Sequence, residues 1–142
     1  MTKVLPFEMC DLIGFVPRWD MADIETIMQD NLDNPLREMV SLVDEKGMYA
    51  IVGSNILRKH VVEVWIVPSL RVNEHKFFFF KTIKTLVKGY LMAKKGFKRV
   101  EFTIKADWAE GLKWGKTLGF EREGLLKKWD GEDDYVLFAK VI

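Results

Sequence analysis

The residues whose types and spacing could do chemistry lie around Pro68, in the stretch from Val61 to Phe79. The apolar run from Val61 to Val67 is typical of a buried strand, Pro68 opens a loop, and a long helix is predicted to begin at Glu74. A loop between a strand and a helix N-terminus gathers backbone N–H groups and the positive end of the helix dipole, so it suits an anion. Arg71 in this loop could bind a phosphate, although an exposed arginine without a special role explains it equally well.

Other polar residues are weaker candidates. Glu63 lies on the same strand and could be a general base, but a salt-bridged or edge-facing glutamate is the simpler interpretation. His60 and His75 have no acidic or cysteine partner at metal-ligand spacing, so the sequence predicts no metal site. The single cysteine, Cys10, excludes an internal disulfide and fits a reducing compartment.

Composition narrows the classes of protein that fit. The chain has 142 residues, of which 49% are apolar and 30% charged, which predicts a single folded domain over residues 1–142. A net charge of +1 gives no drive toward nucleic acid or a membrane surface. No secretory leader or membrane-spanning stretch is evident, so we expect a cytoplasmic-type protein that is not secreted.

The pattern of apolar residues predicts the elements that must position this loop. We expect helices at 17–29, 74–95 and 108–118, and strands at 3–7, 38–45, 48–56, 61–67, 100–104, 120–126 and 135–142. Turn residues at 31–35 are predicted to end the first helix. Residues 38–45 could form a strand or a helical turn, and a strand is favoured because Lys46-Gly47 then closes a hairpin. Pro6 confines the first strand to an edge or an end, and Gly96 is suited to end the long helix. The strand–helix–strand unit from 61 to 104 predicts two neighbouring parallel strands. The fold class is therefore mixed α/β, in the order β-α-β-β-β-α-β-α-β-β.

Two segments resemble the Gcn5-related N-acetyltransferase (GNAT) family. One is Val67-Pro-Ser-Leu-Arg with the long helix behind it, and the other is Lys116-Thr-Leu-Gly-Phe-Glu-Arg-Glu-Gly, followed by Asp134-Tyr-Val-Leu-Phe. The resemblance covers about Met48 to Ile142, and the order and spacing of the segments carry it. It implies a central sheet that splays between the strands at 61–67 and 100–104, and an acetyl-CoA site after the first of them.

The loop departs from the family's pattern at two positions. The family has Arg/Gln-x-x-Gly-x-Gly/Ala after its Pro, and here Pro68 and Arg71 match, but Glu74 and Lys76 replace the glycines. Those glycines let the backbone approach the cofactor's diphosphate. Glu74 instead brings a carboxylate that would repel a diphosphate at the same place.

The second segment departs as well. Family members carry a tyrosine, which protonates the leaving thiolate, in the helix before Leu-Gly-Phe. Counting back from Gly119, that place holds Gly115, with Trp114 beside it. The family's asparagine at the start of this helix corresponds to Asp107 or Trp108. The sequence thus resembles a fold retained without its usual chemistry.

Two hypotheses follow from these departures. The pattern also resembles small internal virion proteins of short-tailed bacteriophages, which implies a GNAT-fold protein of the host cytoplasm or virion that acts through protein contacts and needs no cofactor or metal. The alternative is a divergent acyl-CoA-dependent N-acetyltransferase. In that case the resemblance implies that acetyl-CoA is bound by Val67, Arg71, Val72, Asn73 and Lys76.

The tryptophans point to a protein interface under the first hypothesis. Trp108 and Trp114 lie six residues apart on one short predicted helix, so they should face different ways. We expect one to pack beneath the helix and the other to lie near the surface, where it could anchor a partner. The alternative is that both belong to the core, with Gly111 and Gly115 making room for them.

Overall fold

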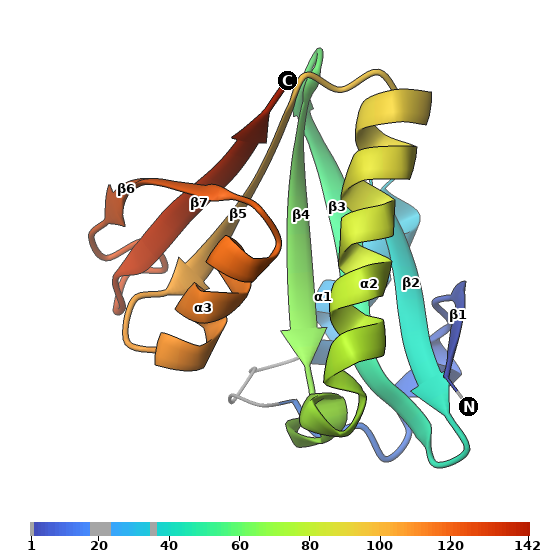
Figure 1. Cartoon of the computed structure of the whole chain (residues 1–142). Coiled ribbons are helices and arrows are strands. Elements are labelled where there is room, and N and C mark those ends of the chain that lie inside the picture. Colours follow the sequence, from blue (N-terminus) through green and yellow to red (C-terminus); the bar gives the residue numbers. More distant parts are fainter. Residues whose placement is uncertain (1, 18–23, 35–36) are drawn as a thin grey trace. The chain divides into compact units, whose positions relative to one another are not determined.

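Figure 1 shows the computed structural model of the chain, which describes residues 2–17, 24–34 and 37–142. The chain divides into two compact units, described separately below. One comprises Met1–Ile56 with Val64–Phe79, and the other Leu57–Glu63 with Phe80–Ile142. Strand β4 (Val61–Pro68) and helix α2 (Lys76–Thr85) contribute residues to both. That residues 1–142 fold as one domain stays a prediction.

The first unit is an antiparallel meander that ends in β4. Its other strands are β1 (Lys3–Pro6), β2 (Arg37–Asp44) and β3 (Gly47–Arg58), in the hydrogen-bonded order β1-β2-β3-β4. The predicted hairpin is confirmed, because Asp44 pairs with Gly47 and the left-handed φ of +113° at Gly47 suits glycine. β1 is the edge strand that Pro6 led us to expect.

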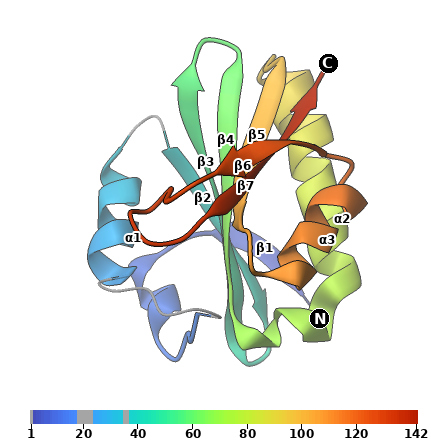
Figure 2. The ribbon, with the colours of Figure 1, turned by 90° about the vertical axis from the view of Figure 1, so that its left-hand side faces the viewer.

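One face of this first sheet is covered by α1 (Ile24–Asp33) and the 3₁₀ turn η1 (Met9–Leu12), as Figure 2 shows for α1. Met28 of α1 packs against Met48 and Ile51 of β3 and Val67 of β4. This cluster anchors the end of β4, and so also the start of the loop that follows it.

The predicted bounds of the first helix are wrong at its C-terminal end. The turn signal of residues 31–35 does not end the helix at Asn31, which is 5% exposed and lies inside α1. Its side-chain amide donates to the carbonyl of Ile27 at 2.8 Å and accepts from Arg37 at 3.1 Å, so burial and two hydrogen bonds outweigh its low helix propensity. Pro17, the predicted start, lies in a β-bridge with Ser69, and residues 18–23 lie outside the described part of the chain.

The second unit is built on the start of β4. Its strands β5 (Arg99–Lys105), β6 (Glu121–Leu126) and β7 (Tyr135–Val141) follow in the order β4-β5-β7-β6, and α3 (Ala109–Thr117) links β5 to β6. β4 and β5 are parallel neighbours, as predicted. Their ladder joins residues 61–63 to 99–101 and ends at the Glu63–Glu101 pair, which fits the predicted splay. Among the described residues, the strands form one mixed α/β sheet of seven strands, with β4 common to both units.

The long helix is more varied than predicted. A 3₁₀ segment, η2 (Leu70–His75), precedes α2, and a π-helical segment, η3 (Leu86–Lys94), continues it. The N–H of Lys95 bonds the carbonyl of Tyr90, five residues back, at 2.9 Å. Gly96 ends the helix with a φ of +72°, as its place in the sequence predicted. No helix among the described residues is long and apolar enough to cross a membrane.

Candidate functional site

Ser69 holds the loop after β4 through hydrogen bonds of its backbone and of its side chain. The N–H of Ser69 donates to the carbonyl of Tyr49 on β3 at 2.9 Å, and the Ser69 hydroxyl accepts from the N–H of Arg71 at 3.1 Å. Val67 and Val72 are 5% and 0% exposed, so these two predicted cofactor residues anchor the loop. The other three differ, because Asn73 and Lys76 are exposed and Arg71 is half-buried.

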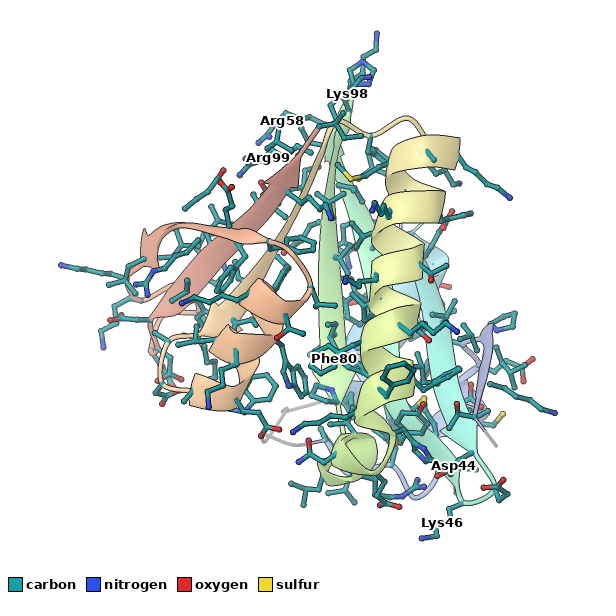
Figure 3. All side chains as sticks on the ribbon, in the orientation of Figure 1. Asp44, Lys46, Arg58, Phe80, Lys98 and Arg99 are labelled. Atoms are coloured by element: carbon teal, nitrogen blue, oxygen red, sulfur yellow. The ribbon has the colours of Figure 1, made fainter. Side chains whose placement is uncertain are left out.

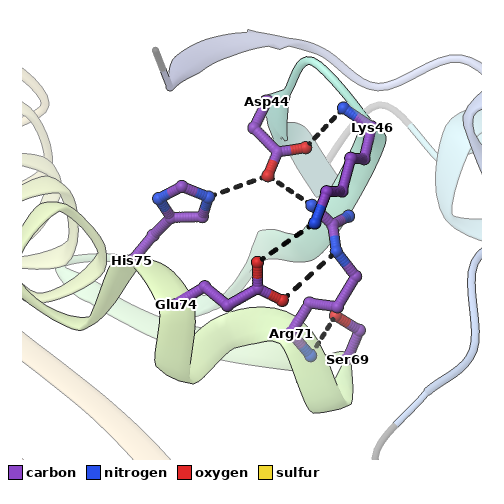
Figure 4. Close-up of polar contacts among 6 residues, drawn as sticks. All are labelled: Asp44, Lys46, Ser69, Arg71, Glu74 and His75. Carbon is purple, nitrogen blue, oxygen red and sulfur yellow. Dashed lines mark hydrogen bonds and ion pairs between the residues drawn. The ribbon is translucent and has the colours of Figure 1, made fainter.

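Asp44, at the end of β2, binds this loop (Figure 4). One carboxylate oxygen, Oδ2, accepts a hydrogen bond from the guanidinium of Arg71 and also bonds Nε2 of His75 at 2.8 Å. The other oxygen accepts the N–H of Lys46 at 2.9 Å, a turn that aspartate commonly forms. The Asp44 side chain is only 4% exposed, against 28% for Arg71 and 23% for His75. Figure 3 marks Asp44 and Lys46 at this hairpin.

Glu74 joins the same group more loosely. Its carboxylate lies 3.6 Å from Nε of Arg71 and 3.8 Å from Nζ of Lys46, and its side chain is 48% exposed. Ion pairs this long and this exposed contribute little to stability, on the order of 0–1 kcal/mol. We call Asp44, Lys46, Arg71, Glu74 and His75 the Asp44 cluster.

Electrostatics keep the centre of the Asp44 cluster ionised. Burial alone would raise the pKa of the Asp44 carboxyl, but hydrogen bonds from Arg71, His75 and the Lys46 N–H outweigh it and hold that pKa well below its usual range. The hydrogen bond to Asp44 raises the pKa of Arg71 against the effect of burial. At neutral pH the pair is therefore a carboxylate and a guanidinium.

The cluster adds contacts that the sequence did not predict. His75 has no acidic partner at metal-ligand spacing along the sequence, yet it bonds a carboxylate 31 residues away. The guanidinium of Arg71 is engaged by Asp44 and Glu74, and its binding of a phosphate stays a prediction. The donor atoms of Asp44, Glu74 and His75 lie within 4.8 Å of one another, but the cation among them is that of Arg71, and we assign no metal there.

Sequence reasoning missed Asp44 altogether. Its position before Lys46-Gly47 marks it as a turn residue, and nothing in that local pattern points to a loop 27 residues further on. The contact exists because Asp44 ends β2 beside Gly47, while β4 ends at Pro68 in the same sheet and starts the loop.

Glu63, the candidate base, lies on β4 opposite Glu101 in the parallel ladder and is half-buried. Glu101 accepts a hydrogen bond from Arg99 at 2.8 Å, and Arg99 also binds Glu123 of β6. Glu63 makes interactions of its own, and its role as a general base stays a prediction.

The place of the family's tyrosine is closed by packing within the second unit. Gly115 is buried, and a Cβ on it would come within 2.8 Å of the ring of Phe138. Phe138 is 1% exposed and stacks on Phe102 with 5.3 Å between ring centroids, so it has little room to move. A side chain at position 115 would therefore point into the core.

The two tryptophans of the predicted interface differ in burial. Trp114 is 4% exposed and meets Phe80 edge-on, with 5.7 Å between ring centroids, whereas Trp108 is half-buried. The two indole rings pack edge to face, with 4.9 Å between ring centroids. Gly111 makes room for Trp108, since a Cβ there would lie 2.3 Å from that indole. Of the pair, Trp108 keeps more solvent-exposed surface; its role at an interface stays a prediction.

Comparison with known proteins concerns the fold. No family model matches the sequence, and no curated protein matches it. Among solved structures, the chain is similar to the ribosomal-protein-S18-alanine N-acetyltransferase of Escherichia coli, with a TM-score of 0.77 and 15% identity over 100% of this chain and 94% of that one. It is also similar to a chimera of the Vibrio cholerae spermidine N-acetyltransferase SpeG and hSSAT, with a TM-score of 0.72 and 13% identity over 99% of this chain and 95% of that one. The seven-stranded sheet, the loop after β4 and these likenesses together show that the chain has the fold of the Gcn5-related N-acetyltransferases.

Proposed function

We propose that this chain is an acyl-CoA-dependent N-acyltransferase, with acetyl-CoA as the first donor to test. The observation that carries the proposal is the likeness of its fold, along the whole chain, to acetyltransferases. The loop that follows β4 supports the proposal, because the cations of this loop lie where the resemblance to the GNAT family implies a diphosphate.

A diphosphate at the loop requires Glu74 to turn away and Arg71 to leave Asp44 for the anion. Arg71 and Lys46 supply positive charge, and both contact the Glu74 carboxylate. Because Glu74 is 48% exposed and its ion pairs are long, turning it into solvent costs little. Arg71 and the backbone N–H groups of the loop would then bind the diphosphate, helped by the adjacent helix N-terminus.

The chemistry proposed for the chain is modest. Acetyl-CoA supplies an activated acyl group as a thioester, and the protein binds and orients it. Glu63 is the proposed general base for the attacking amine, on the strength of its position on β4. A side chain at position 115 would point into the core, so we assign no residue to protonate the leaving thiolate.

A second function is favoured by the ion pairs themselves. Arg71 is already neutralised by Asp44 and approached by Glu74, which is how a GNAT-fold protein that has lost its cofactor would look. Such a protein would act through protein contacts, with Trp108 as a candidate anchor, in a host cytoplasm or a virion. This is the bacteriophage-like hypothesis from the sequence, and it needs no acetyl-CoA.

Calorimetric titration with acetyl-CoA separates the two functions. We expect micromolar binding by the wild type and tighter binding by Glu74→Gln, by roughly threefold to tenfold, since loss of a nearby like charge is worth on the order of 1 kcal/mol. Arg71→Gln should weaken binding. Glu25→Gln, which removes an exposed carboxylate from α1, is the control for net charge. No heat at millimolar acetyl-CoA, for the wild type and Glu74→Gln alike, would contradict the transferase.

A further inference from the structure

Arg71 and His75 share a single oxygen of Asp44. Arg71 donates to Oδ2, and Nε2 of His75 lies 2.8 Å from the same atom. An ionised carboxylate only accepts hydrogen bonds, so Nε2 of His75 carries its proton even when the imidazole is neutral. A second proton would therefore go onto Nδ1, and the 23% exposed side chain gives solvent access to the ring.

Asp44 is too buried to be left without a cation. With 4% of its side chain exposed, an unpaired carboxylate there would lose most of its hydration, which is strongly unfavourable. If Arg71 turned away toward an anion, Asp44 would keep the Lys46 N–H and the His75 ring. A protonated His75 would restore the missing positive charge without any movement of the backbone.

The groups around His75 favour this exchange. Asp44 faces it from β2, and the ring of Tyr49 on β3 packs against it with 4.6 Å between ring centroids. Glu74 is its neighbour in η2. The donor atoms of Asp44, Glu74 and His75 all lie within 4.8 Å of one another. Arg71 is the cation that opposes protonation while it stays on Asp44. Lys46 lies further out, with 73% of its side chain exposed and its ammonium toward Glu74.

We propose that His75 is the reserve cation of Asp44, so that release of Arg71 from Asp44 is coupled to uptake of one proton from solvent by His75. Anions that recruit Arg71 would then bind more tightly when His75 is protonated. Only the identity of the anion rests on the proposed function. If the chain is an acyltransferase, the anion is the diphosphate of acetyl-CoA.

The exchange can be tested without any ligand by NMR titration of the imidazole protons. The chain has two histidines, so His60, in the turn between β3 and β4, is an internal control for folding and referencing. In Arg71→Gln, the titration midpoint of His75 should rise by about one pH unit relative to the wild type, the size of shift that a lost neighbouring charge typically produces. In the double variant Asp44→Asn with Arg71→Gln, the rise should disappear.

The outcomes are separable. A rise confined to His75 and dependent on Asp44 supports the reserve cation. No rise in Arg71→Gln, an equal rise at His60, or a rise that survives Asp44→Asn overturns it. Calorimetry with acetyl-CoA in two buffers of different ionisation enthalpy then measures proton uptake on binding, which His75→Asn should abolish. Absence of acetyl-CoA binding counts against the proposed function, whereas the ligand-free titration decides the reserve cation by itself.

Discussion

The Asp44 cluster in the first unit and the packing around Gly115 in the second differ in the residues that stand where the resemblance to the GNAT family implies others. At the loop, Glu74 stands where the resemblance implies a glycine, and its side chain is half exposed and held by long ion pairs. At α3, Gly115 stands where the resemblance implies a tyrosine, and Phe138 packs closely against it. One replacement can move and the other cannot.

This contrast teaches which of the two places can rearrange. The Glu74 carboxylate lies near water, so moving it costs about 1 kcal/mol or less, while Arg71 stays bound to the buried Asp44. Aromatic rings in a close-packed core have no such freedom, because any added atom displaces a neighbour. The loop can therefore adapt to a substitution more easily than the surroundings of Gly115.

The largest effect should come from the aromatic packing itself. Trp114→Ala removes a ring that is 4% exposed and contacts Phe80 and Trp108, so we expect a loss of roughly 3–5 kcal/mol in the free energy of unfolding. Trp129→Ala, at a 56% exposed tryptophan, should change it by less than about 0.5 kcal/mol. Urea denaturation measures both. A small loss for Trp114→Ala would mean that this tryptophan is available to a partner after all.

The Asp44 cluster should be the source of an acid-sensitive part of the stability. The folded-state pKa of Asp44 is depressed, so the unfolded state binds more protons, and the stabilisation is present above the unfolded value near 3.9 and is lost as the pH falls toward the folded value. Urea denaturation between about pH 5 and pH 2 should show a fall that Asp44→Asn reduces by on the order of 2 kcal/mol. Asp30→Asn, which removes an exposed carboxylate of α1, should leave the fall as it is in the wild type. An equal fall in all three proteins would contradict the assignment.

The smallest effect concerns a single added methyl group. Gly115→Ala places a Cβ 2.8 Å from the Phe138 ring and should destabilise the fold by roughly 1–3 kcal/mol. Gly89→Ala, in η3, is the matched control, because a Cβ there meets no atom within 4 Å, and it should stabilise by roughly 0.5–1 kcal/mol. Thermal melting of the two variants compares them directly. If both shift the melting temperature in the same direction, position 115 is not closed by packing.

The architecture was largely predictable from the sequence, because it follows from local patterns. Apolar runs, alternation and turn residues predicted the seven strands of the described residues, and the buried strands on either side of a long helix predicted the parallel pair β4 and β5. Glycine predicted the end of the long helix at Gly96, where a left-handed φ is needed. Each of these signals lies in one continuous stretch of the chain.

Local signals misled where tertiary contacts outweighed them. Asn31 is a residue type that favours turns, but burial and a hydrogen bond from Arg37 keep it in α1. The change from α- to π-helix at Leu86 was not predicted from the apolar residues of this stretch.

The candidate site shows the same division. The sequence by itself determined that Arg71, Glu74 and Lys76 follow Pro68, and so that a charged loop stands where the family has glycines. The tertiary structure decided that Asp44 holds this loop. Strand pairing brings Asp44 to Arg71 and His75, which lie 27 and 31 positions further along the chain, and no spacing rule connects them. It likewise decided that Gly115 faces Phe138, since the direction of a Cβ depends on how α3 packs on its sheet and not on the neighbouring residues of the chain.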